Sequence, residues 1–306
     1  AALLKAVLMA SARNMTGQLG ASPLADAPSN VQGWGRLLLD DALYFTGDAR
    51  RVLAYDVANG EGLSTGDAAT YAFEVTSASE PLKVMLAWTD PPAAALASPA
   101  LVNDLDLSVV APDARVYRGN QWTADDINTP GDKESLAGAT ATDTLNNVEG
   151  VVIISPQTGH HTISIDAASV PGYQSVFAQG YALVVTGAVR AGPSGAVPDG
   201  AAGAPLLVDK AGAGDLSLSW SAACLRSDGD YAVYEGTLGS PASHVPKTCS
   251  TGGATQAAVT PDAGDRYFLV VPRNGVHEGS YGLDSGGAER APSASACLPR
   301  LVQACP

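Results

Sequence analysis

Carboxylate and amide side chains gather where the sequence predicts that three β-strands begin or end. They lie in "WTDPP", "VNDLD" and "NNVEG". Strand ends meet at the rims of a β-sandwich, so these oxygens are expected to lie near one another. Calcium binds about six to eight oxygens, mostly from carboxylates and carbonyls. The candidate calcium ligands are Asp90, Asn103, Asp104, Asp106, Asn147 and Glu149.

A second interpretation needs no metal. Aspartate and asparagine also cap turns, because their side-chain oxygens accept hydrogen bonds from nearby backbone N–H groups. This interpretation does not account for the free-energy cost of bringing several carboxylates together, because each negative charge disfavours ionisation of its neighbours. The residues therefore favour a structural calcium ion, and turn chemistry remains the alternative.

Other reactive side chains have no partners at catalytic spacing. Ser64 lies in "GLSTG", which fits G-x-S-x-G, but a polar turn precedes it where a nucleophile elbow needs a strand. His160 and His161 are adjacent at a predicted strand start, so they point to opposite faces. No catalytic residue is predicted in this chain.

The composition limits the classes of function. The 306 residues carry a formal net charge of −14, which disfavours nucleic-acid binding because no basic patch could offset that field. An acidic surface suits a secreted protein or one that binds cations. No apolar run is long enough to predict a membrane span.

The four cysteines all lie in the last third of the sequence: Cys224, Cys249, Cys297 and Cys305. They lack CxxC spacing and a nearby histidine suited to zinc. An even, clustered set favours two disulfides and an oxidising compartment. Four cysteines allow three pairings, and we favour Cys224–Cys249 with Cys297–Cys305 because each closes a local loop.

Periodicity predicts a mainly β chain. Alternation with period two runs from about residue 50 to 190 and predicts about eight strands, which suits a jelly-roll-like β-sandwich. A second set of strands has the size of a fibronectin type III-like or immunoglobulin-like sandwich. The expected divisions are a short helical segment (1–45), the jelly-roll-like sandwich (46–190), a Gly/Pro/Ala-rich linker (191–204), the fibronectin type III-like sandwich (205–290) and a disulfide-closed tail (291–306).

Several segments resemble motifs of one protein family, and they occur in the same order as in that family. "LLKAVLMASARNMTG" followed by "QGWGRLLLDDAL" resembles the end of the catalytic domain of subtilisin-like serine proteases, the subtilases of peptidase family S8. "LAWTDPPA", "LVNDLDLSVVAPDARVYRGN" and "NNVEGVVIISPQTGHHTISI" resemble the β-sandwich that follows it in a bacterial branch. The resemblance implies that 1–45 is a remnant of the catalytic domain. It also implies calcium, which such extensions often carry.

The family's Gly-Thr-Ser-Met-Ala segment is absent, and its catalytic residues would all precede residue 1, so no triad residue transfers. The resemblance therefore implies the C-terminal part of a secreted serine endopeptidase, inactive alone and acting as a stabilising extension. Its partners would be the missing catalytic domain and, in the intact enzyme, protein substrates. The apolar stripe of Leu4, Val7 and Leu8 would face that domain and be poorly anchored without it.

The alternative is a non-catalytic secreted module that binds glycan or protein. Two aromatic residues motivate it, Tyr117 and Trp122, which are expected to be exposed on a sheet face.

Overall fold

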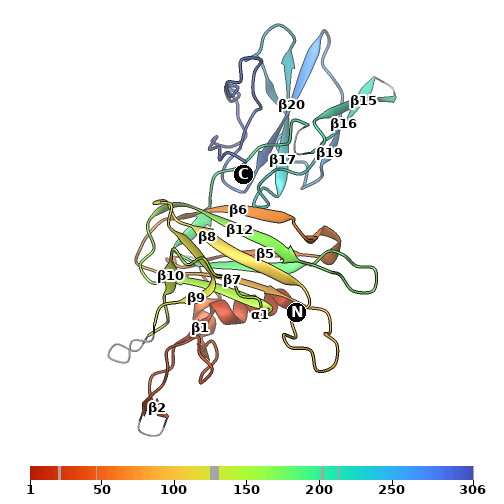
Figure 1. Ribbon diagram of the computed structural model, residues 1–306. Helices are drawn as coiled ribbons and strands as arrows, with labels where there is room; N and C mark the ends of the chain where they lie inside the picture. Colours follow the sequence, from red (N-terminus) through yellow and green to blue (C-terminus); the bar gives the residue numbers. More distant parts are fainter. Residues whose placement is uncertain (20–21, 46, 125–130, 201–202, 213, 306) are drawn as a thin grey trace. The chain divides into compact units, whose positions relative to one another are not determined.

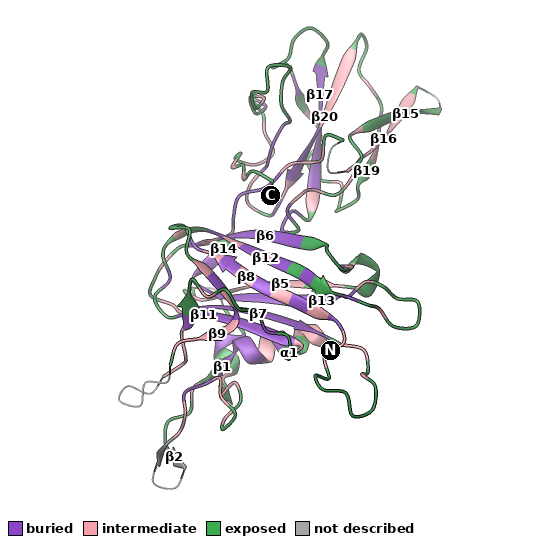
Figure 2. Ribbon diagram, in the orientation of Figure 1, coloured by how far each residue is buried: buried purple, intermediate pink, exposed green. Residues whose placement is uncertain are grey.

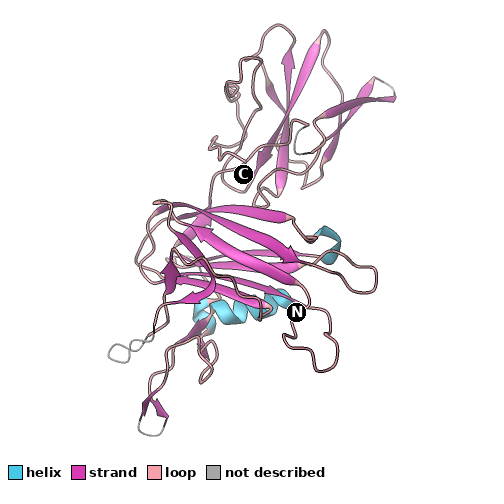
Figure 3. Cartoon of the chain, viewed as in Figure 1, coloured by secondary structure: helices cyan, strands magenta, loops and turns pink. Residues whose placement is uncertain are grey.

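The computed structural model describes residues 1–306 except 20–21, 46, 125–130, 201–202, 213 and 306. Within the described residues, strands make up nearly all the regular structure and α1 (Ala2–Ala10) is the one α-helix (Figure 3). The chain forms two compact units. The first comprises Ala1–Ala69 and Phe73–Arg190, and the second comprises Thr70–Ala72 and Ala191–Pro306. The predicted fold class, two β-sandwiches with a short N-terminal helix, is confirmed.

The first unit is a two-sheet sandwich (Figure 1). Its six-stranded sheet has the order β10-β9-β8-β12-β6-β14, and its four-stranded sheet has the order β11-β7-β13-β5. The strands are β5 (Arg51–Val57), β6 (Ala68–Val75), β7 (Leu82–Trp88), β8 (Asp104–Val110), β9 (Val116–Trp122), β10 (Ser135–Ala137), β11 (Val148–Ile153), β12 (Gly159–Ser169), β13 (Tyr181–Gly187) and β14 (Val189–Ala191).

Burial explains the two strand patterns in this sandwich. β8 alternates, with every second residue buried, as expected for a strand with one face on the core. All residues of β7 and β13 are buried (Figure 2). Those two strands are covered on both faces, because α1 packs against the side of the sheet that faces away from the sandwich core. Their nearly continuous apolar sequences are the result.

Helix α1 is anchored, which corrects the expectation that it would be poorly anchored without a further domain. Ala6 and Ala10 are fully buried in one cluster with Met85 and Val184 of the sheet, whereas Leu4 is 64% exposed. Small alanine side chains allow the helix backbone to lie close to the strands. Residues 1–45 consequently belong to the same compact unit as the sandwich.

After α1, the described part of 1–45 is mostly not helical, which corrects the helical segment expected there. β1 (Ala12–Arg13) pairs with β4 (Arg36–Leu37), β2 (Gln18–Leu19) pairs with β3 (Ser22–Pro23), and only Leu39–Asp41 forms a 3-10 turn. Two contacts account for this. Gly35 has φ +101° and lies against the Arg13 carbonyl, where any Cβ would clash. Arg13 then forms an ion pair with the buried Asp41.

The second unit contains two three-stranded sheets, β15-β16-β19 and β18-β17-β20. Leu218, Trp220, Tyr231 and Val233 pack between them with Val270. The strands are β15 (Leu207–Gly212), β16 (Asp215–Ser219), β17 (Asp230–Thr237), β18 (Val245–Thr248), β19 (Gln256–Val259) and β20 (Arg266–Arg273).

The predicted linker is in part a packed element of the second unit. Residues 192–195 are buried. The Ser194 N–H donates to the Leu301 carbonyl at 2.9 Å, and the Gly195 N–H donates to Asp228 Oδ2 at 2.7 Å. A Cβ on Gly195 would lie 2.6 Å from Cys224 Sγ. Gly195 therefore permits close packing. The Gly-rich composition of 191–204 had instead indicated a flexible linker.

The disulfide pairing differs from the one favoured above. The bonds are Cys224–Cys305 and Cys249–Cys297. The chain after β20 returns along the module, because the Glu278 N–H donates to Pro299 O and the Leu301 N–H donates to Glu278 O. Those contacts bring the tail to cysteines distant in sequence. The tail is therefore not closed on itself but fastened at two points.

We expect both disulfides to stabilise the second unit by similar amounts. They separate cysteines by 81 and 48 residues, so the chain-entropy model gives roughly 4.5 and 4 kcal/mol. The variants Cys224→Ala/Cys305→Ala and Cys249→Ala/Cys297→Ala should each lower the melting temperature strongly. Non-reducing peptide mapping checks the pairing. A Cys224–Cys249 peptide, or one double variant that melts like the native protein, would contradict this account.

Candidate functional site

Asp90 closes the loop between β7 and β8. Its two carboxylate oxygens accept the backbone N–H groups of Val102 and Asn103, each at 2.8 Å. Trp88 Nε1 donates to the Asn103 carbonyl at 2.9 Å, which fixes the same loop from the strand side. Asp90 therefore has the role of a turn residue in this structure.

Asn103 and Asn147 also hold connections in place. The buried Asn103 donates Nδ2–H to Gln179 Oε1 at 2.7 Å, but its Oδ1 has no partner among the described residues. Asn147 donates to the Trp88 carbonyl at 3.1 Å and accepts from Lys5 Nζ of α1 at 3.0 Å. Asn147 thus joins the helix to the sheet rim.

Glu149 on β11 is the most unusual of the six predicted residues. It is 1% exposed, and its Oε2 accepts the Leu107 N–H of β8 at 2.6 Å. Pairing between β8 and β9 ends at Ser108 and Arg118, so β9 does not pair with Leu107. The Glu149 carboxyl accepts the Leu107 N–H instead. Gly119 makes the space, since a Cβ there would lie 2.1 Å from Glu149 Oε2.

The second carboxyl oxygen of Glu149 is buried without a hydrogen-bond partner in the described part of the chain. The pKa of this carboxyl is raised to about 9, mainly by burial, with smaller contributions from the charges of Asp106, Asp143 and Asp104, while the Leu107 N–H opposes the shift. A neutral carboxylic acid, or a bound cation, would resolve this cost.

Asp104 and Asp106 are near enough to Glu149 for their charges to raise its pKa. They alternate with the core residues Leu105 and Leu107, so both occupy the outer face of β8. Burial and the charge of Asp106 raise the pKa of Asp104 to about 6. Burial also raises the pKa of Asp106, against a hydrogen bond from Thr142 and the nearby Arg118 guanidinium. One oxygen of each aspartate is buried without a partner among the described residues.

Sequence reasoning missed Asp143. This residue is 9% exposed and accepts hydrogen bonds from Asn120 Nδ2 at 2.6 Å and from Asn146 Nδ2 at 2.7 Å. Asn120 in turn accepts the Gly150 N–H at 3.0 Å and donates to the Val148 carbonyl at 2.7 Å, which ties β9 to β11. The spacing of Asp143 ahead of "NN" is typical of an aspartate-capped turn and was a usable signal.

The six predicted ligands therefore divide into two groups. Asp90 and Asn147 are occupied by loop and helix contacts, whereas Asn103, Asp104, Asp106 and Glu149 keep unpartnered buried oxygens. Within the described residues, no group of three or more His, Cys, Asp or Glu side chains is placed to hold a metal ion. As the side chains lie here, they form a partly buried acidic cluster and not a complete coordination shell.

The serine and histidine motifs have structural roles. Ser64 lies in a turn in which the Asp67 N–H donates to the Ser64 carbonyl at 2.9 Å. His160 is exposed, while His161 is buried and stacks on Phe73 with ring centroids 5.2 Å apart. The opposite orientations predicted for the two histidines are confirmed.

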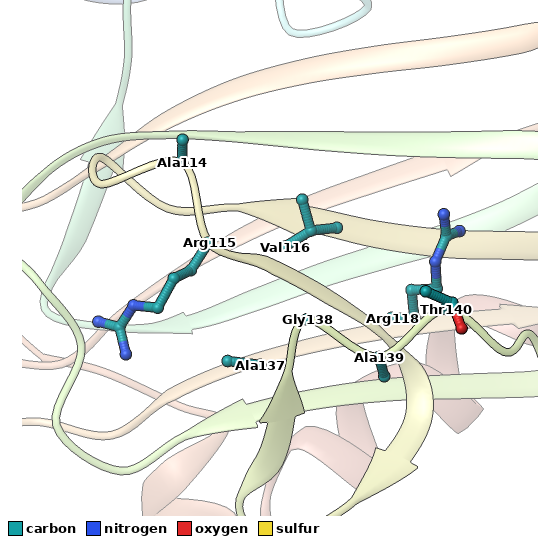
Figure 4. A pocket seen from close by; sticks show the side chains of 8 residues that line it. All are labelled: Ala114, Arg115, Val116, Arg118, Ala137, Gly138, Ala139 and Thr140. Atoms are coloured by element: carbon teal, nitrogen blue, oxygen red, sulfur yellow. The ribbon is translucent and has the colours of Figure 1, made fainter.

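A cavity of about 450 Å³ lies beside β9 and residues 137–140 (Figure 4). The Arg115 and Arg118 side chains extend away from each other along it. Arg115 is paired with Asp113 at 2.6 Å. None of the predicted ligands lines this cavity.

The aromatic residues that suggested a binding face are not free. Tyr117 is 3% exposed in the core. Trp122 packs edge-to-face on Trp34, with ring centroids 5.9 Å apart, beside the cluster around α1. The expected exposed aromatic pair is therefore wrong, since both rings complete the packing of the sandwich.

Comparison with known proteins shows a distant and partial relation. No family model matches the chain. Two Dictyostelium discoideum proteins, Serine protease/ABC transporter B family proteins tagD and tagB, are 28% identical over 184 residues and 27% identical over 209. The alignments cover 49% and 55% of this chain but 10% of each relative. The chain thus spans about a tenth of the length of the curated relatives it matches.

Similarity to solved structures is weak. A two-domain fibronectin type III segment of chicken tenascin has a TM-score of 0.25 at 13% identity, over 71% of this chain and 94% of that one. The Endo-D glycoside hydrolase domain of Streptococcus pneumoniae R6 has a TM-score of 0.21 at 12% identity, over 78% and 32%. Scores this low support no argument about function. The chain is similar in part, and distantly, to proteins named as serine proteases.

Proposed function

We propose that this chain is the C-terminal part of a secreted subtilisin-like serine endopeptidase, and that it serves there as a stabilising extension. The order of the subtilase-like segments and the partial similarity to proteins named as serine proteases support this proposal. The resemblance transfers no triad residue to this chain, so peptide hydrolysis would belong to the intact enzyme.

An exposed apolar segment carries the proposal. Leu39, Leu43 and Phe45 are 58%, 54% and 67% exposed, and Leu37 and Tyr44 lie beside them in sequence at 52% and 48%. Exposed apolar surface of this kind is typical of an interface. The segment is joined to packed structure, because α1 packs on the four-stranded sheet and β1 pairs with β4, which directly precedes the segment. In the intact enzyme this segment would contact the catalytic domain.

One further observation is consistent with secretion. All four cysteines form disulfides, which persist in oxidising compartments. Among the described residues, no helix has the length and apolar character needed to cross a membrane.

Charge placed on the apolar segment of the intact enzyme tests the proposed contact. We expect Leu39→Asp/Phe45→Asp to shorten the half-life of activity at elevated temperature severalfold, because it weakens the contact with the catalytic domain. Leu136→Asp is the matched control, since Leu136 is 48% exposed on β10. Equal half-lives for the native enzyme and the double variant would contradict a stabilising contact at this segment.

We also propose that calcium binds at the acidic cluster and is held by Asp104, Asp106 and Glu149 with Asn103. The support is their unpartnered buried oxygens and the raised pKa values of the carboxyls. A cation would permit several carboxylates to stay ionised together. Without a cation, Glu149 would remain a neutral acid, so the two states respond differently to pH.

In chelator, we expect the first unit to lose stability as pH rises. The folded-state pKa of Glu149, about 9, lies above its ordinary value of 4.5, so folding favours the protonated form. The contribution is complete below about pH 4.5 and is lost as pH rises towards 9. At about pH 8, calcium should restore stability, by ~2.7 kcal/mol at a hundredfold excess over Kd.

Melting curves of the chain with and without calcium, at several pH values, check both the pH dependence and the stabilisation by calcium. Glu149→Gln should remove the part of the pH dependence in chelator that lies above about pH 6, the pKa of Asp104, together with the response to calcium. Glu61→Gln on the exposed turn should change neither. Identical melting in calcium and in chelator at about pH 8 would reject the calcium site. Melting in chelator that does not vary with pH would reject the buried neutral acid.

A further inference from the structure

β20 is an edge strand of the second unit. It pairs with β17 along one side and ends the sheet order β18-β17-β20. Its other side is covered only at the C-terminal end, where the Gly279 N–H donates to the Pro272 carbonyl at 2.9 Å and Arg273 bridges to Glu278. From Arg266 to Val271, β20 has no second strand partner within the described residues.

The direction of the free peptide groups follows from Pro272. In an antiparallel strand, the N–H and C=O of alternate residues point to the same side. Because the Pro272 carbonyl faces away from β17, those of Val270 and Phe268 do so as well. This edge therefore presents two N–H and two C=O groups in the spacing that an added strand would pair with.

A groove of about 1070 Å³ lies along this edge, with Phe268, Leu269 and Val270 among its lining residues. No residue of β17 lines it, so it is on the free side of β20. One wall includes Val197 and Leu206, which pack on the core between the sheets. The other wall includes Tyr281, which packs on the opposite face of β20 with Leu269, and Leu283.

The two walls match the geometry of an extended polypeptide. Successive side chains of a strand point to opposite faces of a sheet. A strand added to β20 would therefore place alternate side chains against Val197 and Leu206 and the others against Tyr281 and Leu283. Natural sheets usually protect such an edge with charge, bulges or a covering segment. Here the covering segments form walls and leave the edge between them.

The charged residues that line the groove indicate the charge of the ligand it would bind. Three carboxylates line the groove, those of Asp199, Asp284 and Glu289, against the guanidinium of Arg290. Because Glu289 also lies 3.9 Å from the Arg300 guanidinium, the unbalanced negative charge comes mainly from Asp199 and Asp284. This excess favours a positively charged ligand, in a protein whose formal net charge is −14.

We propose that this groove binds an extended polypeptide segment with alternating apolar and basic residues, by strand addition to β20. Main-chain hydrogen bonds to Phe268 and Val270 would supply affinity, and the two apolar walls and the carboxylates would supply selectivity. This site belongs to the second unit alone and does not depend on the proposed protease origin.

Calorimetry with the purified chain tests strand addition. The probe is an end-capped decapeptide of alternating lysine and valine, at about 0.15 M salt so that unspecific attraction between exposed charges is screened. Full N-methylation of the same peptide removes its N–H donors but keeps its side chains and charge. We expect saturable binding of the probe, at least about tenfold weaker binding of the methylated peptide, and no detectable binding of the glutamate–valine analogue.

Protein variants place the site. Leu283→Asp and Asp199→Lys should each weaken binding at least about fivefold, because they alter one apolar wall and one carboxylate. Leu238→Asp is the matched control, since Leu238 is 63% exposed in the same unit and does not line the groove. Unchanged melting temperatures and disulfide maps verify folding. The proposal is wrong if no saturable binding occurs, if the methylated peptide binds equally well, or if Leu238→Asp weakens binding as much as Leu283→Asp.

Discussion

The packing of α1 on the four-stranded sheet is the contact on which the first unit depends. It buries the face of β7 and β13 that the six-stranded sheet leaves uncovered, around Met85, Ala182 and Val184. Those two strands can be apolar on both faces only because the helix is present. Without it, their outward side chains would form a contiguous apolar surface, which soluble proteins rarely expose. The helix and the sandwich are accordingly one compact unit.

The acidic cluster follows from how β8, β9 and β11 meet. β9 leaves β8 after Arg118, and the Glu149 carboxyl enters beside Gly119 to accept the Leu107 N–H. A buried carboxyl at such a point costs free energy unless it is neutral or neutralised. The same side chain thus supports the sheet and has a pKa raised to about 9. The proposed response to protons and calcium depends on this raised pKa.

Much of the first sandwich could be predicted from the sequence, since the alternation in β8 and the apolar run of β11 reflect burial directly. Prediction was less successful where distant contacts decide the local structure. The Arg13–Asp41 ion pair and the close approach at Gly35 replace an expected helix. Ser194 and Gly195 are small because they pack closely within the second unit, and they are not part of a flexible linker. The cysteines pair across the module, since the tail returns to its beginning.

The helix contact can be tested in the chain as it stands. Ala6 is fully buried under the sheet and Leu4 is 64% exposed on the same helix, so a charge at each position has a different cost. The measurement is the thermal melting of Ala6→Asp beside that of Leu4→Asp. The account predicts that Ala6→Asp lowers the melting temperature of the first unit by about 5 °C or more, while Leu4→Asp leaves it nearly unchanged. Equal melting of both variants and the native chain would show that α1 does not support the sandwich.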